Sequence, residues 1–260
     1  PNNRIYKSGI SASHFTHALE TLAMSGPVAP DKVLVLGLGV GEIPTNLSKN
    51  GSTIDVVELD PKVLKIAQKY FDFDQSLINL YLEDARTFVR RCQRKYDVIL
   101  VDLYQGDGIP SHVVSFNFFK DIKECLSDHG ALVMNAIYGA NNSTSKKALF
   151  KTLVSAYDRI VVFEALAKKG QTAQQGYILA RNTNDPWTFT VSTASLPNFI
   201  AKALSPVFKN WKEYNQESEF IKHITPIYDE RNDWRRQTID VNIAYRKMLV
   251  SKLPWQVLLD

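Results

Sequence analysis

The sequence has few cysteines and no long apolar run. Its two cysteines, Cys92 and Cys125, occupy apolar positions of helical patterns and lack the spacing of metal ligands. We therefore expect reduced core thiols, no bound metal and a cytoplasmic location. No apolar segment approaches the ~20 residues that a membrane-spanning helix needs. We accordingly expect a soluble chain without a signal peptide or a membrane span.

A strong excess of either charge is also lacking. The 31 basic and 27 acidic residues give a formal net charge of +4, which favours neither nucleic acid nor a membrane surface as a partner. One compact basic cluster falls on one side of a predicted helix, and we interpret it as a solvated face: Arg86, Arg90, Arg91, Arg94 and Lys95. Because residue 1 is proline rather than methionine, we also allow for an upstream segment, such as a membrane or N-terminal domain.

What the sequence does contain is a strand-and-turn segment near its start. Residues 32–42 read KVLVLGLGVGE, in which four apolar residues run straight into Gly37, Gly39 and Gly41. A buried strand that feeds a glycine-rich turn is the usual way in which a parallel sheet presents a nucleotide site. Glycine lets the backbone turn sharply and approach a ligand. The same pattern also serves packing alone, so the residues that follow decide between the two interpretations.

Apolar runs and helical patterns alternate along the chain, as is typical of a doubly wound α/β sheet. We expect strands at 33–36, 53–59, 78–82, 96–103 and 131–137, separated by helices, and a further helix at 145–157. The strand at 96–103 is apolar without alternation and must be central. Two more strands, at 159–166 and 176–181, predict an antiparallel hairpin at one edge of the sheet.

These elements predict the domain organisation. Residues 1–31 form a helical lead-in, and residues 32–184 form a Rossmann-like domain with a mostly parallel, seven-stranded sheet and an antiparallel edge hairpin. Residues 185–260, which hold three of the four tryptophans on amphipathic segments, form a helical C-terminal extension packed on that domain.

Three predicted strands end at an acidic residue. Glu58 follows the second strand, Asp84 the third, and Asp102 lies near the end of the fourth. Because ligands of such sheets bind outside the carboxyl ends of the strands, these acids and the glycine turn form one constellation. Glu58 is well placed to accept hydrogen bonds from both ribose hydroxyls. Asp60 is interpreted as a helix cap, whereas Asp84 fits either a cap or a ligand contact.

The spacing of the glycines separates two nucleotide classes. A dehydrogenase fingerprint requires a glycine where Glu42 stands. The spacing Gly37-x-Gly39-x-Gly41 instead resembles motif I of the class I methyltransferase fold, which binds S-adenosylmethionine. Four segments narrow the match: VLVLGLGVGE, VVELDPKVLKIAQKYF, LEDARTF and YDVILVDLYQGDGIPSHVVS. In this order and spacing they resemble the spermidine synthase family, and a methyltransferase branch acting on protein lysine is similar over the same residues, about 14–140.

The resemblance implies a role for each residue at the predicted sheet edge. For the cofactor, S-adenosylmethionine or its decarboxylated form, it implies contacts from Gly37, Gly39, Gly41, Glu58, Asp84, Ala85 and Asp102. Asp107 would deprotonate an amine nucleophile, helped by Asp102 and Tyr104. His17 and His112 would contact the substrate, which is a small-molecule or protein amine. A homodimer is compatible with the sequence.

Two departures from the family pattern bear on the reaction. Aminopropyltransferases carry an aspartate inside the glycine turn, where this chain has Val40, and a His-Glu pair on the preceding helix, where it has His17-Ala18. A polycationic polyamine needs several carboxylates, so the sequence alone favours methyl transfer, which requires mainly alignment of a neutral nucleophile. The alternatives are a polyamine aminopropyltransferase that uses decarboxylated S-adenosylmethionine, and a non-catalytic S-adenosyl-binding module.

Overall fold

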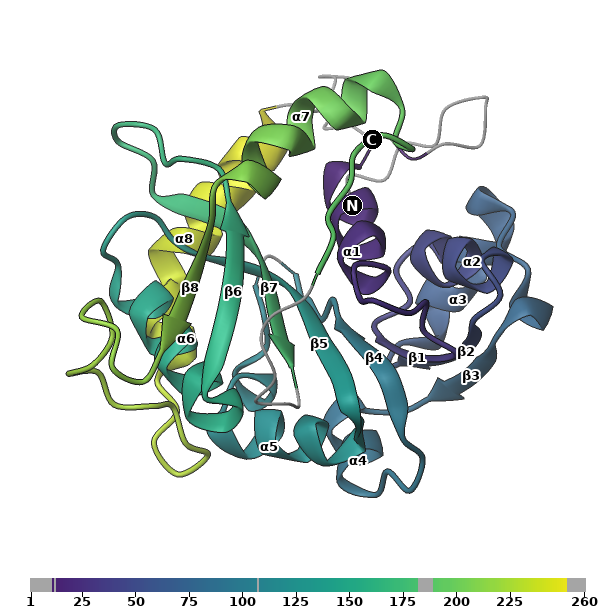
Figure 1. Ribbon diagram of the computed structural model, residues 1–260, viewed down its shortest axis with the longest axis horizontal. Coiled ribbons are helices and arrows are strands. Elements are labelled where there is room, and N and C mark those ends of the chain that lie inside the picture. The colour runs from purple at the N-terminus through teal and green to yellow at the C-terminus, as the bar shows by residue number, and fades with distance from the viewer. Residues whose placement is uncertain (1–10, 12, 107, 182–188, 252–260) are drawn as a thin grey trace.

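A computed structural model describes residues 11, 13–106, 108–181 and 189–251, which form one eight-stranded sheet with helices on both faces (Figure 1). The strands are β1 (Lys32–Leu36), β2 (Thr53–Glu58), β3 (Asn79–Leu82), β4 (Tyr96–Val101), β5 (Leu126–Gly139), β6 (Arg159–Glu164), β7 (Ala173–Arg181) and β8 (Trp211–Asn215). The helices are α1 (His14–Ala23), α2 (Glu42–Lys49), α3 (Pro61–Phe71), α4 (Ala85–Arg90), α5 (Phe116–Cys125), α6 (Thr144–Tyr157), α7 (Asn198–Lys209) and α8 (Trp234–Val250). Two short 3-10 helices, η1 (Gln75–Leu77) and η2 (Ser111–Val113), complete the described elements.

The sheet confirms the predicted fold class. Its strand order is β3-β2-β1-β4-β5-β7-β6-β8, in which the first five strands run parallel and the last three are antiparallel to their neighbours. The strand order reverses between β1 and β4, and this is where an open α/β sheet binds its ligand. The apolar strand β4 is central, as expected from its composition.

The sheet has one strand more than the seven expected. Residues 211–215, within the predicted helical extension, form β8 and pair with the outer edge of β6. This pairing satisfies backbone groups that an exposed edge strand would leave open. The predicted boundary at residue 184 lies outside the described residues, so the division into domain and extension stays a prediction.

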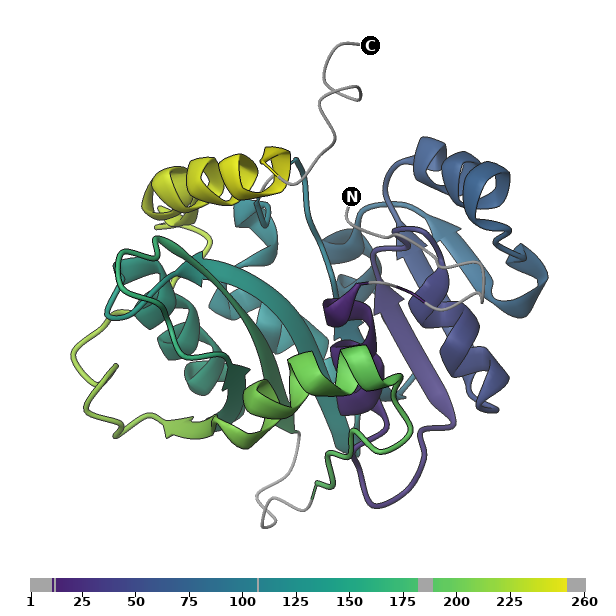
Figure 2. The same cartoon turned by 90° about the horizontal axis from the view of Figure 1, so that it is seen from above.

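Two apolar clusters hold the layers together. One packs α1, α2, α3 and α7 onto one face of the sheet, and the other packs α4, α5, α6 and the start of α8 onto the opposite face (Figures 1 and 2). Cys125 is buried in the second cluster, whereas Cys92, two residues beyond the end of α4, is only partly buried. Among the described residues, no helix is both long and apolar enough to cross a lipid bilayer.

The basic cluster is not simply a solvated face. Arg86 is buried, forms an ion pair with Asp229 and donates from Nη1 to the carbonyl oxygen of His112 at 2.8 Å. The interpretation as a solvated face is therefore wrong for Arg86. The sequence could not show this, because the carboxylate that pairs with Arg86 comes from a loop 143 residues away in the chain. Arg94 is exposed but pairs with the buried Asp55 at 3.0 Å. Neighbouring acids thus offset much of the local positive charge.

A buried ion pair joins α6 to the antiparallel part of the sheet. Lys146 and Glu164 are only 5% and 8% exposed, and Lys146 Nζ lies 2.5 Å from Glu164 Oε1. The hydroxyl of Tyr138 donates to Glu164 Oε2 at 2.8 Å. Tyr138 reaches this position because residue 176 is glycine, and a Cβ there would stand 1.9 Å from its hydroxyl oxygen. One carboxylate therefore links β5, β6 and α6.

The buried pair of Lys146 and Glu164 allows a prediction about the stability of the protein. We expect Lys146→Met to destabilise the protein by about 3–5 kcal/mol, because it leaves the buried carboxylate of Glu164 without its cation. The double variant K146M/E164L should recover most of that loss, since it removes both charges. Urea unfolding followed by circular dichroism measures both effects. Lys120→Met, which breaks an exposed pair, is the matched control and should cost less than about 1 kcal/mol. A K146M variant as stable as the wild type would contradict the assignment.

Candidate active site

The glycine turn between β1 and α2 lies at the carboxyl edge of the sheet. Gly37, Gly39 and Gly41 all have positive φ angles, of 101°, 56° and 82°. A Cβ on Gly37 would stand 2.5 Å from the carbonyl oxygen of Asp102, and one on Gly41 would stand 2.2 Å from the ring of Phe73. Of these three glycines, Gly39 alone faces open space: a Cβ there would meet nothing within 4 Å. Packing within the protein thus explains two of the glycines, and Gly39 is the one that leaves room for a ligand.

Glu58 closes β2 and holds the glycine turn. Its Oε2 accepts a hydrogen bond from the backbone N–H of Leu38 at 3.0 Å, and its Oε1 accepts one from the N–H of Asp60 at 2.9 Å. Asp60 itself caps α3 by accepting from the N–H of Lys62, which confirms its interpretation as a cap. Each Glu58 oxygen keeps a second acceptor position. The side chain can therefore shape the turn and also accept hydroxyl donors.

Asp84 proves to be a helix cap that also contacts a predicted site residue. Its Oδ1 accepts from the N–H of Thr87 at 2.9 Å at the start of α4, and Nε2 of His112 lies 3.1 Å from its Oδ2. Partial burial alone would raise the pKa of Asp84, but the hydrogen bonds from Thr87 and His112 outweigh it and lower this pKa below its usual value. Ala85 follows as a buried first residue of α4.

Asp102 lies directly after β4 in a network of uncharged groups. Its Oδ1 accepts from Nδ2 of Asn135 on β5 at 2.9 Å, and Oδ1 of Asn135 accepts from Nε2 of Gln175 on β7 at 2.8 Å. The hydroxyl of Tyr104 donates to the carbonyl oxygen of Asn135 at 3.2 Å. Burial raises the pKa of Asp102 to about 6, although the bond from Asn135 acts in the opposite direction. A carboxyl group with this pKa is suited to accept a proton near neutral pH.

Asp107, the predicted base, lies outside the described residues, so its role stays a prediction. The described groups that approach the same sheet edge are the glycine turn, Glu58, Asp84 and Asp102. His112 joins them through Asp84.

His17 belongs to a buried group between α1 and α2. Its Nε2 donates to the carbonyl oxygen of Ser11 at 3.0 Å, when the proton is placed on that nitrogen, and its Nδ1 lies 3.8 Å from Oε2 of Glu20. Glu20 accepts from Nδ2 of Asn46 at 2.8 Å. Burial raises the pKa of Glu20 to about 8, the hydrogen bond from Asn46 lowers it, and the charge of Glu42 raises it further.

Glu42 follows the glycine turn as the first residue of α2. Burial raises its pKa, whereas hydrogen bonding with Ser11 and the charge of His17 lower it. Its Oε2 is buried and has no hydrogen-bond partner among the described residues. In the sequence this residue only marked the place of a missing glycine.

Three residues near the candidate site were not singled out from the sequence: Asn135, Glu20 and Gln175. Two of them carry a sequence signal that could have identified them. Asn135 is the one polar residue in the apolar run at 131–137 of β5, so its position alone could have marked it. Glu20 follows His17 by three positions on a helix, and such spacing places two side chains on one face. Gln175 shows no signal, because its contact with Asn135 depends on how β7 pairs with β5.

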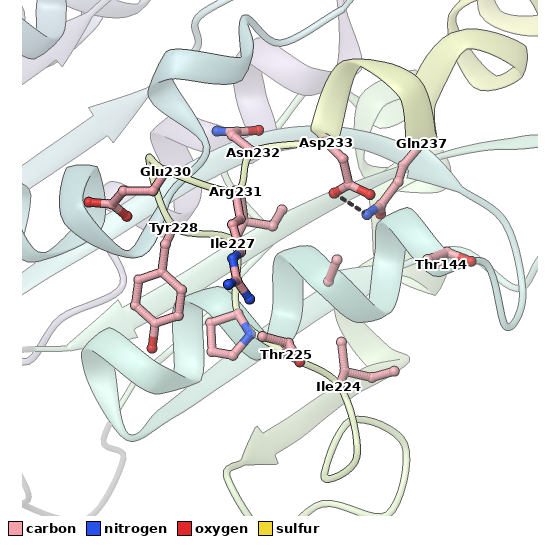
Figure 3. A pocket seen from close by; sticks show the side chains of 12 residues that line it. Thr144, Ile224, Thr225, Ile227, Tyr228, Glu230, Arg231, Asn232, Asp233 and Gln237 are labelled. Carbon is pink, nitrogen blue, oxygen red and sulfur yellow. Dashed lines mark hydrogen bonds between the residues drawn. The ribbon is translucent and has the colours of Figure 1, made fainter.

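A separate cavity of about 860 Å³ lies between α6, α8 and the loop at 224–233 (Figure 3). Its lining includes Thr144, Arg231 and Asp233. The Oδ1 of Asp233 accepts a hydrogen bond from Nε2 of Gln237 at 2.6 Å. None of the predicted site residues lines it. The described residues also hold no group of three or more histidine, cysteine, aspartate or glutamate side chains arranged to bind a metal.

Comparison with known proteins supports the family resemblance. A model of the spermine/spermidine synthase domain matches residues 13–166. The polyamine aminopropyltransferase of Vibrio vulnificus is 38% identical over 123 residues, which are 45% of this chain and 40% of that protein. The N-terminal histidine N-methyltransferase of Emericella nidulans is 32% identical over 145 residues, which are 54% of this chain and 25% of that protein. The chain thus spans less than half the length of these relatives.

A solved structure supports the fold. The crystal structure of a probable spermidine synthase from Corynebacterium glutamicum superposes with a TM-score of 0.64 at 16% sequence identity, covering 85% of this chain and 81% of that chain. At this identity the likeness concerns the fold alone. The matched domain spans more than half of the chain and contains all the strand-end residues described above, so the chain belongs to the spermine/spermidine synthase domain family.

Proposed function

We propose that this chain transfers an aminopropyl group from decarboxylated S-adenosylmethionine to the nitrogen of an amine. In this reaction a C–N bond forms while the C–S bond of the sulfonium breaks, and 5′-methylthioadenosine leaves. The family match and the relative from Vibrio vulnificus support this alternative over the methyl transfer that the sequence alone favours. The geometry near the glycine turn supports it as well.

The strand-end residues fit an S-adenosyl group. Open space above Gly39 admits the chain that carries the sulfur, and a side chain at that position would close it. Glu58 lies beside the turn with an acceptor position left on each oxygen, which suits a ribose diol. Asp84 has a lowered pKa and stays ionised, so it can accept from an amino group of the base.

Glu42 carries the preference for the decarboxylated compound. Glu42 is the residue directly after the glycine turn, and its buried Oε2 has no hydrogen-bond partner among the described residues. An ammonium group without a neighbouring carboxylate would be attracted to this carboxylate, whereas the α-carboxylate of S-adenosylmethionine would be repelled. Glu42 thereby supplies the negative charge that aminopropyltransferases carry inside the glycine turn, at the position where this chain has Val40.

Glu20 supplies a second acid beside His17. The family pattern has its glutamate at the position of Ala18, which carries no charge. With its pKa raised to about 8, Glu20 is largely neutral at pH 7. A cation bound nearby would favour its ionised form and lower that pKa, so amine binding would release a proton. The two acids that the sequence pattern lacks therefore have counterparts in the folded protein.

Asp102 is the described residue best suited to accept the proton of the attacking amine. A pKa of about 6 leaves the carboxylate mostly ionised at pH 7, and Asn135 holds one oxygen while the other can face the amine. Asp107 remains a second candidate for this base. Tyr104 supports the network by its hydrogen bond to the Asn135 backbone.

Methyl transfer is the second candidate. Val40 inside the glycine turn favours it, as does the likeness to the N-terminal histidine N-methyltransferase of Emericella nidulans. One base and good alignment suffice for this reaction. A small-molecule or protein amine is the proposed acceptor in either case. The cytoplasmic location and the homodimer stay predictions.

Titration calorimetry with the two S-adenosyl compounds tests the proposal. We expect the wild type to bind decarboxylated S-adenosylmethionine at least about tenfold more tightly than S-adenosylmethionine. Glu42→Gln should reduce that ratio by about tenfold, because it removes the charge that distinguishes them. Glu124→Gln, an exposed acid, is the control. Tighter binding of S-adenosylmethionine by the wild type would replace the proposal by methyl transfer, and no binding of either would refute both.

Two substitutions of Glu58 test the ribose contact. Glu58→Ala removes the acceptors of the Leu38 and Asp60 N–H groups, and we expect about a hundredfold weaker binding of 5′-methylthioadenosine. Glu58→Gln keeps one oxygen acceptor without the charge and should lose about tenfold. Thermal unfolding of both variants checks that the turn still folds. Equal affinities in all three proteins would rule out a contact with the nucleoside.

A pH profile tests the base. A base with a pKa near 6 must lose its proton to work, so wild-type kcat/KM should fall about tenfold per pH unit below 6. Asp102→Asn should lower kcat by at least about a hundredfold, remove this acidic limb and leave 5′-methylthioadenosine binding unchanged. Asp107→Asn is measured in parallel. If Asp107→Asn removes the acidic limb and Asp102→Asn does not, the base is Asp107.

A further inference from the structure

The two cysteines of the chain meet where α4 and α5 end. Cys125 is the last residue of α5, and Cys92 lies two residues beyond the end of α4. The two helices pack against each other on one face of the sheet (Figure 1). The carbonyl oxygen of Val89 accepts from the backbone N–H of Cys92 at 3.2 Å and from Sγ of Cys125 at 3.4 Å. One carbonyl group thus holds both residues.

Further contacts fix the same two segments beside each other. Nζ of Lys95, three residues after the first cysteine, donates to the carbonyl oxygen of Glu124, directly before the second. At the next position along each segment, the first residues of β4 and β5 are partners in the parallel pairing. The side chain of Cys92 packs against the apolar cluster that contains Cys125. The packing therefore brings the two thiols together, and they hydrogen-bond to each other.

The two thiols differ in exposure and in acidity. Cys125 is 1% exposed, whereas Cys92 is only partly buried. The hydrogen bond between them is the largest influence on both groups: it lowers the pKa of Cys92 and raises the pKa of Cys125. The positive charge of Lys95 also lowers the pKa of Cys92, although partial burial acts in the opposite direction. A partly exposed thiol with a lowered pKa beside a second thiol is typical of redox-sensitive cysteines.

We infer that Cys92 and Cys125 are a redox modification site, which hydrogen peroxide converts into a disulfide. Cys92 reacts first, because peroxide can reach it and its thiolate is favoured, and Cys125 completes the bond. The site is independent of the proposed transfer reaction, in which neither sulfur takes part. The segment between the two cysteines contains β4, Asp102 and α5, so the disulfide ties together the two ends of a segment that carries a strand-end acid.

The oxidation proceeds in two balanced steps. The thiolate of Cys92 attacks one oxygen of hydrogen peroxide, the O–O bond breaks, and the leaving hydroxide takes up a proton to become water. Cys92 is then an uncharged sulfenic acid, so its charge no longer raises the pKa of Cys125. The sulfur of Cys125 attacks the sulfur of Cys92, the S–O bond breaks, and the thiol proton leaves with the hydroxide as water. The two thiols lose two electrons, which reduce the peroxide to water.

Peptide mapping of the folded protein without reduction tests this site. After treatment with hydrogen peroxide, we expect one linked pair of peptides that contains Cys92 and Cys125 and has lost two hydrogen atoms. Dithiothreitol should restore both thiols. The result is unambiguous, because the chain has only these two cysteines and every disulfide within it must join them.

Substitutions test the order of the two steps. Cys125→Ala removes the second thiol, so the sulfenic acid of Cys92 should persist and react with dimedone. Cys92→Ala should leave Cys125 unreacted, because that thiol is buried. We expect Lys95→Met to slow the loss of free thiols about threefold, since it removes a charge that favours the thiolate. Lys120→Met, an exposed lysine of α5, is the matched control and should react like the wild type.

The peptide map of the wild type decides the inference even where a variant fails to fold, which thermal unfolding would reveal. Two free thiols after peroxide treatment overturn the site, and so does a disulfide between two chains in place of the bond within one chain. Sulfinic acid at Cys92 without any disulfide overturns it as well. Oxidation of Cys125 in the Cys92→Ala protein at the wild-type rate overturns the assignment of Cys92 as the first thiol to react.

Discussion

The close approach of two strand ends is the constraint on which the site depends. The N–H of Asp102 donates to the carbonyl oxygen of Leu36 at 3.0 Å, which ties the end of β4 to the end of β1. At this contact a Cβ on Gly37 would collide with the Asp102 backbone. The turn that leaves room for a ligand at Gly39 and the carboxylate of Asp102 are therefore positioned by the same packing. A change at Gly37 would move both.

Low exposure sets the electrostatics of the candidate site. Burial is the largest influence on the pKa values of Asp102, Glu20 and Glu42, and in each case it raises them. A carboxyl group that is costly to ionise in the free protein becomes a strong partner for a buried cation. Burial is how a chain of nearly balanced charge would offer the site for a cationic group that we propose. It also links the binding of that group to pH.

The antiparallel half of the sheet and the C-terminal segment serve stability and the site together. The ion pair of Lys146 with Glu164 fastens α6 to β6, and β8 covers the outer edge of the sheet. The same half contributes Gln175 and Tyr177 from β7, next to Asn135. Asp229, in the loop before α8, pairs with Arg86, which supports the backbone at His112. Residues after 185 therefore help to hold the candidate site in place, through the contact of Asp229 with Arg86.

The sequence by itself determined the doubly wound fold, the central place of β4, the strand-end acids and the cap at Asp60. These features follow from local patterns, in which apolar periodicity and turn chemistry act within a few residues. Only the tertiary structure decided that burial raises the pKa of Glu20, that Arg86 is buried against Asp229, and that residues 211–215 form a strand. Each depends on contacts between segments distant in the chain, because burial and pairing partners are set by packing and not by neighbouring residues.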